Sequence, residues 1–270
     1  MITFVCFLWP GKRNYKPAHV NQLANAVHYF YPRPHKFVCV TNQVAGFNEL
    51  VTQVPMPSRA ERLGTLAAPQ GRDFPSSFRR MWLFSDEAIA LGDTLFQMDV
   101  DSMVVGDLRP LVDYMPDQDF IGWRPAKCWG KETRIAGGTW RLRAGSHTRL
   151  WDEFESNPMG WIRHARVRRW NGSDQAQISL YFDEREKCKI WQKDCGIHGA
   201  QEGVFQWNYP PPGAKIVHCN GDEKHFGQSK LWMDAYNKAF ANPSERTIDD
   251  FFEDEYDNPD SPRHPPATLA

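Results

Sequence analysis

Two aspartates stand one residue apart near the middle of the chain. Asp99 and Asp101 follow the largely apolar run of residues 95–98, which is typical of a buried strand. In an extended chain, residues i and i+2 point to the same side, so the two carboxylates would present oxygen ligands together. Like charges this close repel each other unless a cation lies beside them. Carboxylate oxygens suit Mg²⁺ or Mn²⁺, and such sites commonly also hold substrate phosphates.

This Asp-x-Asp pair has other interpretations when it is taken alone. A solvated pair of aspartates in a turn is common. A calcium-binding EF-hand loop is excluded, because the chain has Val104 and Pro110 where that loop needs glycine and glutamate. In a phosphatase or phosphotransferase with an Asp-x-Asp signature, the first aspartate would be a nucleophile. That signature usually lies on the first strand, whereas here the pair begins at residue 99.

A histidine, a glycine and a lysine occur at a regular spacing after a late strand-like run. They form the pattern His218-x-x-Gly221-x-x-Lys224. Taken alone, His218 would be interpreted as a core histidine at a strand end, although an imidazole is also a common metal ligand. This spacing favours a ligand site only through the family resemblance given below, which implies that Gly221 lets the backbone approach a ligand closely and that Lys224 places a point charge on a phosphate.

The elements that must position these residues alternate between strands and helices. Strands are expected over residues 2–9, 35–41, 93–100, 119–123 and 214–219, and helices over residues 17–31, 78–91, 145–156 and 173–182. The first strand, helix and second strand form a β-α-β unit, which predicts a parallel sheet flanked by helices. Ligands of such sheets bind beyond the carboxyl ends of the strands, where Asp99 would lie. We expect one α/β domain over residues 1–242 and an acidic, proline-rich mobile tail over residues 243–270.

The overall composition limits the partners of the chain. It has 32 Lys and Arg residues against 33 Asp and Glu, a formal net charge of -1, whereas a general nucleic-acid binder is usually more basic. No apolar run is long enough to span a bilayer. The spacing of Cys188 and Cys195 fits no zinc motif, and Cys6, Cys39 and Cys219 lie in apolar runs. We therefore expect reduced thiols and a cytoplasmic protein.

Four segments, taken in order, resemble the nucleotide-sugar glycosyltransferases of the GT-A fold, in particular the retaining family 8 and related phage and bacterial enzymes. The segments are WPGKRNY (9–15), FRRMWLF with GDTLFQMDVDSMVVGDLRPL (78–111), NGSDQAQISLYF (171–182) and AKIVHCNGDEKHF (214–226). The resemblance implies a GT-A (Rossmann-like) fold with a mixed, mostly parallel sheet flanked by helices. It also implies an enzyme that transfers a sugar from a nucleotide sugar, UDP-linked, to an acceptor.

The resemblance assigns a role to each matching residue. Asp99, Asp101 and His218 would hold a metal ion, Mn²⁺ somewhat in preference to Mg²⁺ because the set includes an imidazole. Arg80 matches the basic residue of the family on the helix before Asp-x-Asp, and Arg79 is the competing choice. The residues implied in binding the nucleotide sugar are Trp9, Lys12, Tyr15, Arg80, Gly137, Gly138, Gly221 and Lys224.

Asp174 and Gln175 follow Ser173 at an expected helix start. Capping of that helix by Ser173 or Asp174 would be a sufficient account of these residue types. The resemblance implies instead that Asp174 binds hydroxyl groups of the donor sugar and that Gln175 lies near the anomeric carbon. An amide is a poor nucleophile compared with the carboxylate of retaining glycosidases, so front-side displacement with retention of configuration is the expected reaction.

The chain also departs from the family pattern. The segment around Gly137 and Gly138 lacks the usual asparagine, and Lys224 is followed by His-Phe in place of Pro-Trp. A third interpretation is therefore a non-catalytic GT-A-like protein that binds carbohydrate or nucleic acid. The arginine-rich run 161–170 is either a solvated face or a grip on an anionic acceptor. The acceptor itself, whether glycan, lipopolysaccharide, protein or modified DNA, depends on loops that vary freely on one fold.

Overall fold

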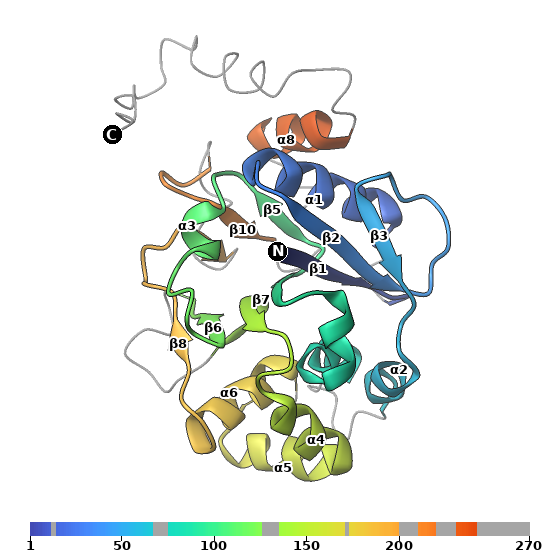
Figure 1. Ribbon diagram of the computed structural model, residues 1–270, viewed down its shortest axis with the longest axis vertical. Helices are drawn as coiled ribbons and strands as arrows, with labels where there is room; N and C mark the ends of the chain where they lie inside the picture. Colours follow the sequence, from blue (N-terminus) through green and yellow to red (C-terminus); the bar gives the residue numbers. More distant parts are fainter. Residues whose placement is uncertain are drawn as a thin grey trace.

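The computed structural model is a layered α/β arrangement in which a central sheet has helices on both faces (Figure 1). It describes residues 1–11, 15–66, 75–125, 135–170, 173–199, 210–219 and 231–241. The tail expected over residues 243–270 lies outside this described part. Within the described ranges, none of the helices combines the length and the apolar character that crossing a membrane requires.

The central sheet has seven strands in the order β3-β2-β1-β4-β7-β6-β8. Its strands are β1 (Ile2–Leu8), β2 (His35–Thr41), β3 (Val51–Val54), β4 (Thr94–Met98), β6 (Phe120–Trp123), β7 (Ala136–Arg143) and β8 (Lys189–Ile190). β1 pairs in parallel with β2 and β4, and β2 with β3, whereas β7 runs antiparallel to β4 and β6. The expected β-α-β unit is present, because α1 (Pro17–Phe30) connects the parallel strands β1 and β2.

A second sheet of three strands brings a distant segment to the end of β4. It consists of β5 (Ser102–Val104), β10 (Ile216–His218) and β9 (Ile197–Gly199). β10 pairs antiparallel with β5, so that His218 lies opposite Ser102, and parallel with β9. Because β5 follows the Asp-x-Asp segment directly, this pairing carries His218 to the two aspartates.

Side chains of β1 alternate between two hydrophobic cores, as expected of a strand buried on both faces. Phe4 and Cys6 belong to the core beneath α1 and α8 (Leu231–Ala241), whereas Val5 and Phe7 belong to the opposite core. The helices that contribute to the opposite core are α2 (Ser58–Gly64), η1 (Pro75–Phe84), η2 (Asp86–Leu91), α4 (Thr148–Ser156), α5 (Pro158–Val167) and α6 (Asp174–Glu184). Helices thus cover both faces, as the sequence predicted.

Most of the expected elements are confirmed. The strands expected over residues 2–9, 35–41, 119–123 and 214–219 are β1, β2, β6 and β10, and the helices expected over residues 17–31, 145–156 and 173–182 are α1, α4 and α6. The elements that the sequence did not predict are β3, β5, β7, β8, β9, α2, α3 (Arg109–Val112), α5 and α8. β5 is only three residues long, and β7 has the glycine-containing and partly charged sequence AGGTWRLR, so neither shows a clear apolar pattern.

The strand expected over residues 93–100 is shorter than predicted. It ends at Met98, and Asp99 and Asp101 belong to the tight connection between β4 and β5. The connection closes because the backbone N–H of Ser102 donates to the carbonyl of Asp99 at 3.0 Å. The two aspartates are therefore gathered by a turn, and the expectation that an extended strand aligns them was wrong.

The prediction of a single helix over residues 78–91 was also wrong. The segment consists of two 3₁₀ helices, η1 and η2, separated at Ser85. The N–H of Ser85 donates to the carbonyl of Trp82 at 2.9 Å, which is the i to i+3 spacing of a 3₁₀ turn. Because such a helix has three residues per turn, the neighbours Arg79 and Arg80 point in directions about 120° apart.

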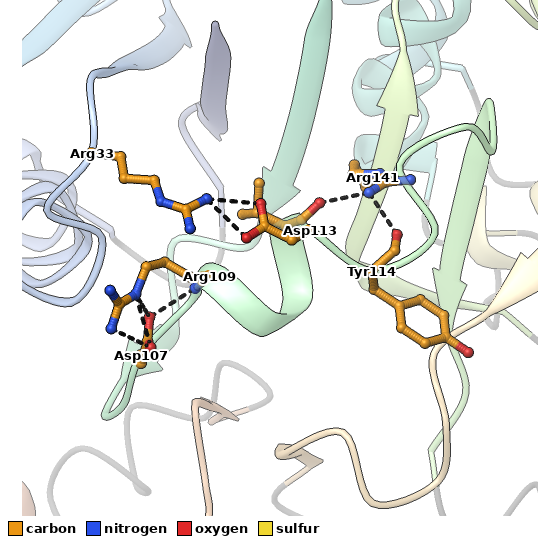
Figure 2. Close-up of polar contacts among 7 residues, drawn as sticks. Arg33, Asp107, Arg109, Asp113, Tyr114 and Arg141 are labelled. Atoms are coloured by element: carbon orange, nitrogen blue, oxygen red, sulfur yellow. Dashed lines mark hydrogen bonds and ion pairs between the residues drawn. The ribbon is translucent and has the colours of Figure 1, made fainter. Parts of the chain in front are cut away.

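A buried arginine of β7 ties down the loop that follows α3 (Arg109–Val112). Arg141 is 3% exposed and donates to four backbone carbonyls, those of Val112, Tyr114, Met115 and Gln118, at 2.6 to 3.3 Å. Figure 2 shows its guanidinium meeting the carbonyl of Tyr114. Burial lowers the pKa of Arg141 from its ordinary value, and the carbonyl dipoles supply the compensation that its charge needs.

We predict that Arg141→Met lowers the free energy of unfolding by about 2–4 kcal/mol, because it removes a charged donor from several carbonyls at once. The matched control is Arg143→Met, whose half-exposed side chain pairs with Asp119 at 3.1 Å; it should cost less than about 1 kcal/mol. Urea unfolding monitored by circular dichroism measures both values. Equal losses in the two variants would contradict the role given to Arg141.

Candidate active site

Asp99 and Asp101 lie at the carboxyl end of a central strand, in the turn between β4 and β5. The N–H of Asp99 donates to the carbonyl of Gly138 in β7 at 2.9 Å, and the N–H of Cys219, just after β10, donates to the carbonyl of Asp101 at 3.0 Å. Backbone bonds from both sheets therefore hold this turn. Its position at the carboxyl end of β4 is where α/β sheets bind ligands.

The guanidinium of Arg80 bridges two carboxylates. Its Nη1 contacts Oδ1 of Asp99, an oxygen that also accepts from Nε2 of Gln97 at 3.3 Å. Its Nε lies 2.8 Å from Oδ2 of Asp174, in an orientation that makes an ion pair but no hydrogen bond. Asp174 is 1% exposed and opens α6, so Arg80 and the positive end of the helix together stabilise its buried charge.

The neighbouring arginine, Arg79, makes different contacts. Arg79 is 5% exposed, donates to both carboxylate oxygens of Glu61 at 2.8 and 2.9 Å, and lies 5.3 Å above the ring of Trp9. The hydrogen bonds from Arg79 lower the pKa of Glu61. Of the two arginines considered from the sequence, the structure brings Arg80 to the aspartates and assigns Arg79 to packing.

His218 is held on three sides. Its Nδ1 lies 2.9 Å from Oγ of Ser102 and its Nε2 2.9 Å from Oγ1 of Thr139. Its ring stacks on Trp123 with the centroids 4.9 Å apart, and the residue is 3% exposed. The imidazole therefore has a defined orientation at the end of β10, with a hydroxyl at each nitrogen.

Two adjacent glycines of β7 leave space at the centre of these groups. A Cβ on Gly137 would lie 3.0 and 3.1 Å from the carboxylate oxygens of Asp174. A Cβ on Gly138 would lie 3.0 Å from the ring of His218 and 3.3 Å from Oδ2 of Asp99. The β6–β7 pairing changes register at this place, and such bulges are common beside active sites. The two glycines therefore keep the carboxylates and the imidazole accessible to one another.

Of the other residues predicted for the site, some contact the aspartates, some do not, and some lie outside the described part of the chain. The hydroxyl of Tyr15 donates to Oδ2 of Asp101 at 3.0 Å, which brings Tyr15 to the cluster. Gln175 is partly buried in the first turn of α6. Trp9 packs against Arg79 and meets no aspartate in the contacts described above. The predicted residues that lie outside the described part are Lys12, Gly221 and Lys224.

Sequence reasoning missed four residues that hold this cluster, namely Gln97, Ser102, Thr139 and Trp123. Gln97 had a signal, because it is a polar residue in an apolar strand, two positions before Asp99 and hence on the same face. The other three contact His218 through the pairing of β10 with β5 and the approach of β6 and β7. Those contacts join segments far apart in the sequence, so no local sequence pattern predicts them.

The site contains oxygen and nitrogen donors of the kinds that a divalent ion needs. In the described part of the chain, no three His, Cys, Asp or Glu side chains already form a metal-binding group. Oδ2 of Asp99 and Nδ1 of His218 nevertheless both lie within 3.3 Å of the position that a Cβ on Gly138 would fill. Asp101 lies in the same turn, so carboxylate and imidazole donors, the kinds of ligand that first-row divalent metals accept, gather at this place.

The thiol beside this cluster is not a strong candidate ligand. Cys219 is fully buried next to the Asp101 turn. Burial, followed by the negative charge of Asp101, raises the pKa of the Cys219 thiol well above its ordinary value. Because the thiolate is the form that binds metals, a neutral Cys219 acts as a packed apolar group.

The arginine-rich run 161–170 belongs largely to α5, and part of its charge is neutralised by α6. Arg168 contacts Asp183 and lies 2.8 Å from Glu184, which also lies 3.1 Å from Nε2 of His164. These pairs join the two helices that precede and contain Asp174. They support the interpretation of the run as a structural, partly solvated face.

No family model matches the sequence, and no curated protein matches it. Solved structures match by their fold. The galactosyltransferase LgtC, in complex with donor and acceptor sugar analogs, has a TM-score of 0.61 at 15% sequence identity, over 90% of this chain and 95% of LgtC. An active-site mutant of LgtC gives a TM-score of 0.56 at 14% identity with the same coverage.

The chain shares the fold of LgtC. LgtC is a galactosyltransferase with the GT-A fold, and the likeness extends over nearly the whole length of both chains. The predicted mixed, mostly parallel GT-A sheet with flanking helices is thereby confirmed. At 14–15% identity the likeness to LgtC concerns the fold; the chemistry must be argued from the residues.

We predict that Gly138→Ala destabilises the protein by about 1–3 kcal/mol, the usual cost of overpacking, and shifts the NMR signals of the His218 ring. His218 cannot easily yield, because two hydroxyls and Trp123 hold it. Gly11→Ala is the control, since its Cβ would meet Trp9 at an ordinary 3.7 Å. Unchanged His218 signals in Gly138→Ala would show that the added Cβ does not press on the His218 ring, which would contradict the 3.0 Å separation given above.

Proposed function

We propose that the chain is a metal-dependent glycosyltransferase that transfers a sugar from a nucleotide sugar, UDP-linked, to an acceptor. The observation that carries the proposal is the bridge of Arg80 between Asp99 and Asp174. It joins Asp99, whose carboxylate at the end of β4 suits a metal ion, to Asp174. The buried carboxylate of Asp174, at the start of α6, suits sugar hydroxyls. The structural likeness to LgtC, which was studied with donor and acceptor sugar analogs, supports the same class of reaction.

The diphosphate end of the donor would lie against the Asp-x-Asp turn. Asp99, Asp101 and His218 would hold Mn²⁺, which when bound supplies Lewis-acid stabilisation of the departing diphosphate. Arg80 adds a guanidinium at the junction of the diphosphate and the sugar, a position where its fixed positive charge favours the developing negative charge. In this proposal Lys224 adds a second point charge, and Gly221 allows the backbone to approach.

The sugar and the nucleoside would occupy the two sides of this junction. Asp174 would accept hydrogen bonds from hydroxyl groups of the sugar, and its contact with Arg80 holds its carboxylate at the start of α6. Gly137 leaves room for the sugar beside Asp174. The nucleoside would lie against the loop after β1, where it would contact Trp9, Lys12 and Tyr15.

We further propose that the reaction retains the anomeric configuration. An inverting enzyme needs a base that takes the acceptor proton on the face opposite the leaving group. Gln175, the residue after Asp174, offers an amide, which is a weak nucleophile but can steady a cationic sugar through its carbonyl oxygen. The departing diphosphate can itself accept the proton of the acceptor, so retention by front-side displacement requires no separate protein base.

We predict that turnover disappears with a chelator and returns best with Mn²⁺, and that Asp99→Ala lowers it at least about 10²-fold, the usual effect of losing a main electrostatic stabiliser. Asp93→Ala, at a side chain that is 91% exposed, is the matched control and should keep wild-type turnover. The assay is release of UDP from a panel of nucleotide sugars in the absence of acceptor.

The same assay separates the rival functions. Release of phosphate from monoesters in place of UDP release would favour an Asp-x-Asp phosphatase, with Asp99 as nucleophile. Release of neither product would favour a non-catalytic binding protein. Full UDP release in excess chelator would refute the metal role and would still be consistent with cleavage of a nucleotide sugar.

We predict that Gln175→Ala slows turnover while UDP affinity stays nearly unchanged, because Gln175 would act mainly in the transition state. Gln192→Ala, at an exposed position after β8, is the control and should change neither value. Proton NMR of the first-formed product tests the stereochemistry. A β-linked product from an α-linked donor would contradict retention and would require a base that the proposal does not include.

A further inference from the structure

The carboxylate of Asp101 is more enclosed than that of its partner in the turn. Asp101 is 5% exposed, whereas the side chain of Asp99 is 31% exposed. A buried carboxylate requires hydrogen-bond donors that keep it ionised and fix its direction. The hydroxyl of Tyr15, 86 residues earlier in the chain, supplies such a bond to Oδ2 at 3.0 Å.

The ring of Tyr15 is well placed to keep that hydroxyl in position. It lies just before α1, packs against the core beneath that helix, and meets His19 edge to face with the centroids 5.8 Å apart. A tyrosine has only two side-chain torsions, so packing of the ring fixes the location of the hydroxyl at its tip. The contact therefore joins the residue just before α1 directly to the Asp-x-Asp turn.

In the described part of the chain, different donors contact the two aspartates. Asp99 is oriented through Oδ1 by Arg80 and Gln97, which leaves Oδ2 directed toward the space above Gly138. Tyr15 makes the corresponding contact to Asp101 through Oδ2. A carboxylate has about four lone-pair positions, so a single hydroxyl can orient it without occupying its whole capacity for a cation.

We propose that Tyr15 is a positioning residue for Asp101, whose hydroxyl holds the carboxylate in the orientation that a divalent cation requires. This rests on the metal role in the proposed function and adds a task that is separate from any contact of the Tyr15 ring with a nucleoside. Partners of this kind, hydrogen-bonded to metal ligands, typically change metal affinity by 10- to 100-fold when they are removed.

The test is Tyr15→Phe, which removes the hydroxyl and keeps the ring. Titration of the full chain with Mn²⁺, followed by electron paramagnetic resonance of the free ion, should show affinity about 10-fold weaker than that of the native protein. The control is Tyr114→Phe, since in Figure 2 the ring of Tyr114 points away from the arginines and only its carbonyl meets Arg141. This control should bind Mn²⁺ like the native protein.

The outcomes separate the two proposals. Native protein that binds no Mn²⁺ would refute the metal role on which this inference rests. Native protein and Tyr15→Phe that bind Mn²⁺ equally would overturn the positioning role and leave the metal role intact. Circular dichroism checks folding. If Tyr15→Phe alone does not fold, 3-fluorotyrosine at position 15 tests the same bond through a more acidic hydroxyl, and an unchanged Mn²⁺ affinity there would overturn the inference.

Discussion

The ion pairs of the largely enclosed Arg80 guanidinium are the interaction on which the arrangement of the site depends. Asp174 is almost completely enclosed and Asp99 is two-thirds buried, and each would raise the energy of the other's charge if no cation separated them. Arg80 contacts both carboxylates. A planar guanidinium with several fixed donors can meet two carboxylates at once, which the single ammonium of a lysine does less well. The bridge therefore joins η1, the end of β4 and the start of α6.

The direction of Arg80 is itself a consequence of the 3₁₀ geometry of η1. Adjacent side chains of such a helix diverge widely, so Arg79 turns to Glu61 and the ring of Trp9 while Arg80 turns to the aspartates. Arg79 occupies the space against Gly64, where an added Cβ would lie 2.4 Å from its guanidinium. Arg79 thus packs η1 against α2, while Arg80 leaves the same helix toward the aspartates.

The second sheet and the glycines of β7 provide the remaining half of the site. Pairing of β10 with β5 brings His218 beside the turn that β5 follows, and the register change in β7 gives its two glycines access to Asp174 on one side and to His218 on the other. Small residues in a bulge are suited to such a place, because they let several polar groups converge without a side chain between them. The hydroxyl of Tyr15 contacts the side chain of Asp101, and the N–H of Cys219 donates to its backbone carbonyl.

The sequence by itself determined the alternation of strands and helices, the parallel β1–β2 unit and the position of Asp99 at the end of a central strand. Hydrophobic periodicity and turn residues are local properties, so they can be recognised within a few residues. The order of four motifs also indicated the GT-A fold, which the likeness to LgtC confirms. These features follow from short segments whose apolar pattern decides both their conformation and which face they bury.

Only the tertiary structure decided which arginine reaches the aspartates, that a turn gathers Asp99 and Asp101, and that Ser102 and Thr139 hold His218. It also decided the antiparallel placement of β7, whose sequence carries no clear strand pattern. Each of these depends on hydrogen bonds and ion pairs between residues distant in the chain. Such contacts form only when two faces have already packed together, so no single segment contains the information that specifies them.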